Sequence, residues 1–358
     1  MHGEVVYFYA FDVANEVVAA RVGTVLGQRP APLELRLKHA VPKDVAYRRP
    51  LVVAPPLDAR LAGEPVRARV HVFDVGVVSV VLRVAFERAG LPELMPFRRP
   101  VLEDGRAPDA VARDLCAAAY RDLDGALVRP SPVTEPEAYT VFCLADLGGA
   151  DDAGRWLAAE RARVAGLLTG LPADRLSEAQ VAETLRYQWS LEKTDLVVID
   201  WDAALVADLA GPADDVLYVL EVANLQLEEF RMMDQALDRD LDRAYDDLGR
   251  RALSLFRSPR PVLRKLRWLR VDLTRLADEV TNITKFVGDW YLARIYLGAR
   301  ERFHLDRWRT SVEQRLGQLD QLYSVVHSEA YERRMLWLEV IIVIFFAIDL
   351  LAIFWWRR

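Results

Sequence analysis

One segment of the sequence concentrates positive charge beside an indole ring. Residues 257–270, RSPRPVLRKLRWLR, contain six basic residues, one tryptophan and no acid. The residues of this basic turn are Arg257, Arg260, Arg264, Lys265, Arg267, Trp268 and Arg270. Basic residues near a membrane surface attract anionic lipid by about 1 kcal/mol each. We therefore expect the basic turn to contact anionic lipid, with ordinary solvated surface and RNA binding as the two alternatives.

RNA binding would be confined to that turn, because the whole chain of 358 residues carries a net charge of −6.

Elsewhere the sequence lacks the patterns that usually carry catalysis. It contains no phosphate-binding glycine loop, no nucleophile elbow and no pair of His or Cys residues at metal-ligand spacing. We expect no catalytic residue, no metal site and no cofactor, and the sequence identifies no small-molecule substrate. An enzyme whose residues converge from distant segments remains an alternative.

Two acids, Glu339 and Asp349, interrupt the most apolar stretch of the chain, residues 335–356. A helix of this length, at 1.5 Å per residue, matches a hydrocarbon core of about 30 Å. A carboxyl group that faces lipid is costly, so we expect Asp349 to lie against a second copy of the helix, protonated or hydrogen-bonded. The alternative is a single protonated Asp349 in a helix apolar enough to carry it.

Charged and aromatic residues border this stretch on both sides. Such residues suit the two interfaces of a bilayer. They are Arg333, Arg334, Trp355, Trp356, Arg357 and Arg358. The stretch therefore predicts a transmembrane helix over 335–356 that anchors the chain by its C-terminal end.

The elements ahead of this anchor fall into two groups. Residues 1–209 combine short runs rich in Val, Tyr and Phe, typical of strands, with patterns of helical spacing. The expected strands are 4–11, 49–55, 67–75, 77–86, 138–147 and 195–201, and the expected helices are 109–127 and 151–168. Ser177 begins a further helix with a capping box. Hairpin-like spacing around Gly76 indicates an α+β fold with a mainly antiparallel sheet.

Three long helices are expected after Gly211 and Pro212, at about 213–257, 261–302 and 305 onward. The second and third carry apolar residues at alternating spacings of three and four, which predicts an antiparallel coiled-coil hairpin that turns near Phe303 and His304. The second helix runs about 60 Å and the third returns about 43 Å before the apolar stretch begins. Because the third helix runs back along the second, the start of the second helix and the basic turn are expected at the end of the stalk that faces the membrane.

These patterns predict three parts, an α+β head at 1–209, a helical stalk at 213–334 and a transmembrane helix at 335–356. The basic turn favours an orientation with the head on the cytoplasmic or matrix side. We expect a single-pass protein of the inner (cytoplasmic) membrane of a bacterium, or of the mitochondrial inner membrane in a eukaryote.

Segments 219–248, 283–308 and 331–350 carry a family resemblance. The most specific residues are Gly288 and Asp289 with Tyr291 and Leu292, the run 303–308, and Arg334, Leu338 and Glu339. The chain resembles the "required for meiotic nuclear division" and YagE-like family of membrane proteins. The resemblance implies an N-terminal α/β part, a C-terminal anchor and a link to translation at the inner membrane through an oligomeric scaffold. It implies no catalytic residues.

The sequence thus predicts a tail-anchored, non-enzymatic scaffold or tether that forms homo-oligomers and contacts anionic lipid, with RNA or the ribosome as a further partner. An oligomeric ion channel or transporter subunit is the alternative. The CorA-type magnesium channels share the order of head, long helices and membrane segment. This chain offers one membrane helix per subunit, with Glu339 or Asp349 as a charged ring.

Overall fold

The computed structural model describes all residues except 35–48, 212, 251–270, 272–289 and 357–358. Within its long helices, the side chains of residues 243–250, 322–334, 337 and 349–356 are also outside the description. The chain divides into two compact units. Unit 1 is Met1–Met232 with Leu276–Trp308, and unit 2 is Met233–Arg275 with Arg309–Arg358. The predicted boundary between head and stalk at 209 stays a prediction.

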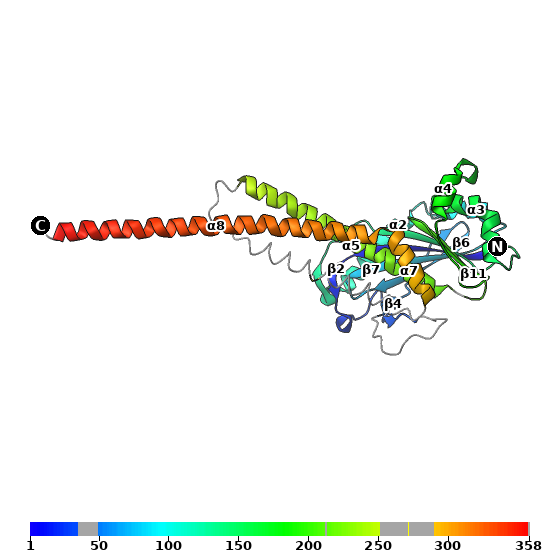
Figure 1. Cartoon of the computed structure of the whole chain (residues 1–358). Coiled ribbons are helices and arrows are strands. Elements are labelled where there is room, and N and C mark those ends of the chain that lie inside the picture. Colours follow the sequence, from blue (N-terminus) through cyan, green and yellow to red (C-terminus); the bar gives the residue numbers. More distant parts are fainter. Residues whose placement is uncertain (35–48, 212, 251–270, 272–289, 357–358) are drawn as a thin grey trace. The chain divides into compact units, whose positions relative to one another are not determined.

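Ten strands of unit 1 form one sheet in the order β10-β11-β12-β9-β1-β7-β6-β4-β3, with β5 paired to β6. Strands β4, β6, β7 and β11 of this sheet are labelled in Figure 1. Their bounds are β1 His2–Asp12, β3 Ala31–Pro32, β4 Leu51–Val53, β5 Arg60–Leu61, β6 Glu64–Val72, β7 Val77–Glu87, β9 Glu137–Leu144, β10 Tyr187–Trp189, β11 Asp195–Ile199 and β12 Ala203–Asp208. Strands β2 Ala14–Val17 and β8 Leu127–Pro130 form a small second sheet. Among the described pairings only β9 and β12 run parallel. The expected α+β fold with a mainly antiparallel sheet is confirmed.

The central strand β1 is buried on both of its faces. Tyr7 and Tyr9 point into the main core cluster, whereas Val6 and Phe8, which alternate with them, are buried on the opposite face of the sheet. A strand that is apolar on both sides requires a covering layer on each face.

The hairpin between β6 and β7 turns at Gly76, as the sequence predicts. Gly76 has φ +94°, a left-handed conformation that favours glycine. A Cβ atom at this position would lie 1.8 Å from the carbonyl oxygen of Ala14. The turn therefore excludes any side chain.

Helices α2 Pro108–Asp122 and α3 Ala153–Thr169 contribute to the core on the first face of the sheet. Shorter helical segments are α1 Met95–Arg98, α4 Glu178–Thr184, η1 Ala19–Arg21, η2 Leu91–Leu94, η3 Asp124–Ala126 and η4 Ala173–Arg175. The Ser177 hydroxyl accepts a hydrogen bond from the backbone nitrogen of Gln180 at 3.2 Å and caps α4. The two predicted helices and the predicted cap are confirmed.

The second face of the sheet is covered by α5 (Asp214–Arg250) up to Met232 and by α7 (Trp290–Arg302). The amide nitrogen of Asn224 in α5 donates to the carbonyl oxygen of Glu137 in β9 at 3.2 Å. The Tyr296 hydroxyl in α7 donates to Gln226 in α5 at 2.6 Å, so the two covering helices also bind each other.

The predicted break between helices near Phe303 and His304 is confirmed, because α7 ends at Arg302 and α8 (Leu305–Trp356) begins two residues after Phe303. The antiparallel coiled-coil hairpin stays a prediction. His304 adopts a left-handed φ of 54° at this corner. The parts of the predicted coiled-coil seam at 266–270 and 272–287 lie outside the described residues. In α8, Leu305, Val312, Leu316 and Leu319 of the expected apolar stripe are buried.

A glycine in α7 lets that helix approach the edge strand β10. A Cβ atom on Gly298 would lie 1.8 Å from the Trp189 ring. We expect Gly298→Ala to lower the free energy of unfolding by about 1–3 kcal/mol, because the ring and the helix must move apart. Urea unfolding of purified protein measures this change.

The matched control is Gly317→Ala in α8, where the added Cβ has no neighbour within 4 Å apart from the adjoining residues and backbone of its own helix. Alanine is a better helix former than glycine by about 0.5–1 kcal/mol, so the control variant should be slightly more stable. Equal effects of the two substitutions would contradict the close packing of α7 on Trp189.

Candidate functional site

The basic turn, Arg257, Arg260, Arg264, Lys265, Arg267, Trp268 and Arg270, lies entirely outside the described residues. Arg357 and Arg358 do as well. The backbone of Arg333, Arg334, Asp349, Trp355 and Trp356 belongs to α8, but their side chains are not among those described. The roles expected for these residues stay predictions.

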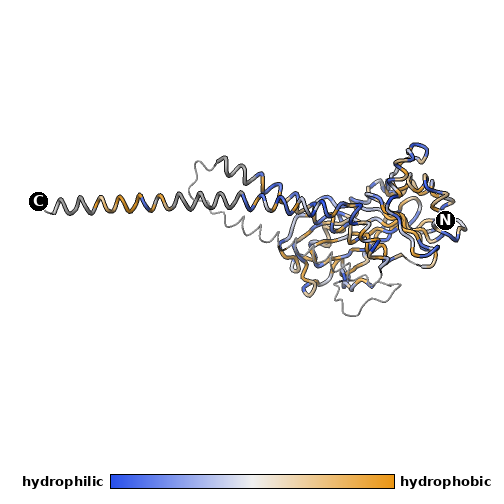
Figure 2. The backbone as a smooth tube through the Cα atoms, viewed as in Figure 1, coloured by the Kyte–Doolittle hydropathy of each residue, from blue (hydrophilic) through white to orange (hydrophobic). Residues whose placement is uncertain are grey.

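Residues 340–348 of α8 form an apolar run, which the hydropathy colours of Figure 2 show near the C-terminal end of the helix. The side chains of this run are exposed. Residues 340–346 follow one another without a polar side chain, and each is between 44 and 69 % exposed. Seven consecutive helical residues point in every direction around the axis, and Glu339 directly before them is exposed too. No helix in the described part of the chain is both long enough and apolar enough to cross a membrane.

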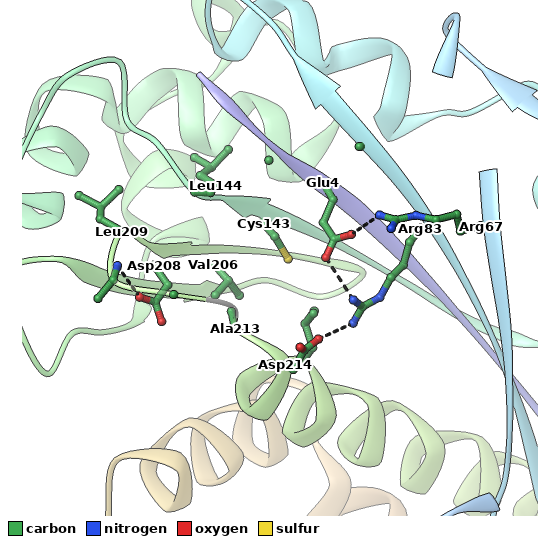
Figure 3. A pocket seen from close by; sticks show the side chains of 16 residues that line it. Glu4, Arg67, Arg83, Cys143, Leu144, Val206, Asp208, Leu209, Ala213 and Asp214 are labelled. Carbon is green, nitrogen blue, oxygen red and sulfur yellow. Dashed lines mark hydrogen bonds and ion pairs between the residues drawn. The ribbon is translucent and has the colours of Figure 1, made fainter. Parts of the chain in front are cut away.

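A pocket with a cavity of about 510 Å³ opens in unit 1 (Figure 3). Strands β1, β6 and β7 supply Glu4, Arg67 and Arg83, and the ends of the parallel strands β9 and β12 supply Cys143 and Asp208. The first turn of α5 adds Asp214 and Leu217. The pocket therefore lies where the two parallel strands end and the covering helix begins.

Four side chains of the pocket form a chain of alternating charge (Figure 3). The nearest N–O distances are 3.4 Å from Arg67 to Glu4, 3.3 Å from Glu4 to Arg83 and 2.8 Å from Arg83 to Asp214. Burial disfavours the charged guanidinium of Arg83, but the neighbouring carboxylates outweigh burial and raise its pKa. Arg83 is therefore a permanent cation between two acids.

The thiol of Cys143 lies beside this charge chain. Burial, and after it the charge of Glu4, raise the pKa of Cys143 well above its ordinary value. The nucleophilic form of cysteine is the thiolate. Cys143 in this setting stays protonated and is not an activated nucleophile.

Further polar side chains are buried between α5 and the second face of the sheet. His71 Nδ1 in β6 lies 2.8 Å from the carboxylate of Glu221, and both residues are buried. His71 is thus a buried residue with an acidic partner. Burial, followed by the charge of Asp12, raises the pKa of Glu228 to about 8.

A buried guanidinium fixes the corner between α7 and α8. Arg302 forms ion pairs with Asp200, which follows β11, and with Glu183 of α4, the latter at 2.7 Å. Its guanidinium carbon lies 5.6 Å from the ring centre of Tyr187 and 5.5 Å from that of Trp201. The four contacts attach α7 to the edge of the sheet.

Sequence reasoning did not find the pocket, because its residues come from five separate segments. One signal was available, since Arg83 is the single charge inside the apolar strand sequence VVSVVLRVAF. A lone charge in a buried strand needs a partner. Nothing in the sequence, however, names Glu4 and Asp214 as those partners. Among the described residues, no cluster of three His, Cys, Asp or Glu side chains is able to hold a metal ion.

The sheet, its two helical layers and this pocket define an α+β domain. A family model described as "Uncharacterized protein MJ0711, N-terminal domain" matches residues 2–214, and the chain belongs to this family. Uncharacterized protein MJ0711 of Methanocaldococcus jannaschii is 20 % identical over 215 residues, which cover 60 % of this chain and 65 % of that protein. This chain thus spans about two thirds of that relative's length. No solved structure matches the chain. The resemblance to the "required for meiotic nuclear division" and YagE-like family stays a prediction.

Glu228 should make the stability of unit 1 depend on pH. Its pKa is raised from 4.5 to about 8, so the folded chain holds one more proton than the unfolded chain between these values. The free energy of unfolding should therefore fall as the pH rises through this window, by about 1.4 kcal/mol per pH unit at most. Glu228→Gln should flatten this slope in unfolding measurements over the same range.

Glu87→Gln is the control, because Glu87 is an exposed acid of β7. It should leave the pH dependence as in the unaltered protein. An identical slope in the Glu228→Gln variant would show that this carboxyl group is ionised in the folded protein.

Proposed function

We propose that the chain is a non-enzymatic scaffold or tether that the apolar end of α8 attaches to a membrane. The observation that carries this proposal is the exposure of residues 340–346 on every side of the helix. Contiguous exposed apolar surface is rare in soluble monomers and marks contact with lipid or protein. Lipid is the surrounding that accepts an apolar helix on all sides at once.

The insertion energy of the whole stretch supports the same proposal. Residues 335–356 include fourteen Leu, Ile, Val or Phe residues. At about −0.3 to −0.6 kcal/mol each, they contribute roughly −4 to −8 kcal/mol, against about +3 kcal/mol for Asp349. A net gain remains, and pairing of Asp349 between two copies would increase it. This is the reason to propose a homo-oligomer.

The remaining parts of the proposal rest on the sequence. The basic turn at 257–270 would contact anionic lipid and favour a cytoplasmic position for the head at the inner (cytoplasmic) membrane. RNA or the ribosome as a partner, and a link to translation, rest on the family resemblance alone.

Fractionation of cells that express the full chain tests the tether. The unaltered protein should stay in the membrane pellet after a high-pH carbonate wash and dissolve only in detergent. The double variant Ile342→Arg/Phe346→Arg should move to the supernatant, because each arginine near the centre of the helix costs about 2.5–3.5 kcal/mol. Both altered residues are exposed in α8.

Gln318→Arg, at an exposed position of α8 ahead of the apolar stretch, is the control and should remain in the pellet. Recovery of the unaltered protein from the supernatant without detergent would refute the proposed tether.

A further inference from the structure

We infer that the pocket of unit 1 binds a small aliphatic zwitterion, a molecule with one carboxylate and one ammonium group, such as an amino acid or a short peptide. This inference concerns a site distant in sequence from the apolar end of α8. It is therefore independent of the proposed membrane tether.

The charge chain leaves opposite charges available at its two ends (Figure 3). The inner members are occupied, since Glu4 lies between two guanidinium groups and Arg83 lies between two carboxylates. They are also less exposed, at 24 % and 17 %. The end members Arg67 and Asp214 are 67 % and 40 % exposed. A ligand carboxylate suits Arg67, and a ligand ammonium group suits Asp214.

A ligand that carries only negative or only positive charge fits this pocket less well than a zwitterion. An anion at Arg67 would also meet the field of three carboxylates, those of Glu4, Asp208 and Asp214. A cation at Asp214 would meet the field of Arg83. Opposed charges within one site discriminate against such ligands. A zwitterion carries one charge that is complementary to each end of the charge chain.

The remaining lining is suited to an aliphatic group. Leu144, Val206, Leu209 and Leu217 border the pocket together with its charged residues. A cavity of about 510 Å³ is within the usual range for small-molecule sites, and an apolar wall with a few placed polar groups is their usual composition. The volume admits a dipeptide as well as a single amino acid.

Calorimetric titration of the purified full chain in mild detergent tests the inference. The probes are leucine and leucyl-leucine, and at least one of them should bind. N-acetyl-leucine lacks the ammonium group and leucinamide lacks the carboxylate, so each should bind about ten- to a hundred-fold more weakly than leucine, and the corresponding dipeptide derivatives more weakly than leucyl-leucine.

Two variants remove one end of the charge chain each. Arg67→Gln and Asp214→Asn should each weaken binding of the zwitterion by about ten-fold or more, with little change in melting temperature, because both side chains are partly exposed. Arg69→Gln, an exposed arginine of the same strand β6 outside the pocket, should bind as the unaltered chain does.

The outcome for the two probes identifies the source of the ligand, since preference for leucine indicates a free amino acid and preference for leucyl-leucine indicates a peptide. The inference is overturned if neither probe binds. It is equally overturned if a derivative without one charge binds as tightly as its parent, or if Arg69→Gln weakens binding as much as Arg67→Gln does. None of these outcomes depends on whether the chain enters a membrane.

Discussion

The structure depends on one constraint, which is that its central sheet is apolar on both faces. Val6 and Phe8 of β1 are buried on the face opposite to the main core, as is Tyr139 of β9. Leaving these side chains in water would cost about 25 cal/mol per Å² of apolar surface. The chain therefore has to return to the sheet after its last strand, and α5 and α7 are the segments that do so. The first turn of α5 also completes the pocket by supplying Asp214.

A second layer needs a fixed attachment, and Arg302 provides it. A buried charge is costly unless it is paired and hydrogen-bonded. Here Asp200 and Glu183 supply the pairing, while Tyr187 and Trp201 flank the guanidinium. The ring of Phe303, the next residue, lies edge-on to Tyr139 at 5.0 Å between centroids. Helix α8 thus starts from a corner that is tied to the sheet by both ionic and aromatic contacts.

The sequence predicts the strands whose apolar residues are β-branched or aromatic, such as β1 and β7. Residues of these types favour strands, and the same side chains pack well on the surface of a sheet. It does not predict β12, whose sequence AALVAD is rich in alanine and lacks that signature. Acidic residues of a helix, such as Glu221 and Glu228, are expected to face solvent, yet both are buried. Their burial follows from the docking of α5 beside His71, a contact between residues 150 positions apart. The pocket was missed for the same reason, because strand pairing brings Glu4, Arg67 and Arg83 together.

A double-mutant cycle on Arg302 and Asp200 tests most directly whether this corner holds the covering layer in place. The cycle compares the free energies of unfolding of Arg302→Met, Asp200→Asn and the double variant with that of the unaltered chain. Removing one partner of a buried pair should cost about 3–5 kcal/mol, and the double variant should cost less than the sum of the single variants by about 2 kcal/mol or more. The account would be contradicted if the costs of the two single variants summed to the cost of the double variant within about 0.5 kcal/mol, because such additivity is typical of residues that do not interact.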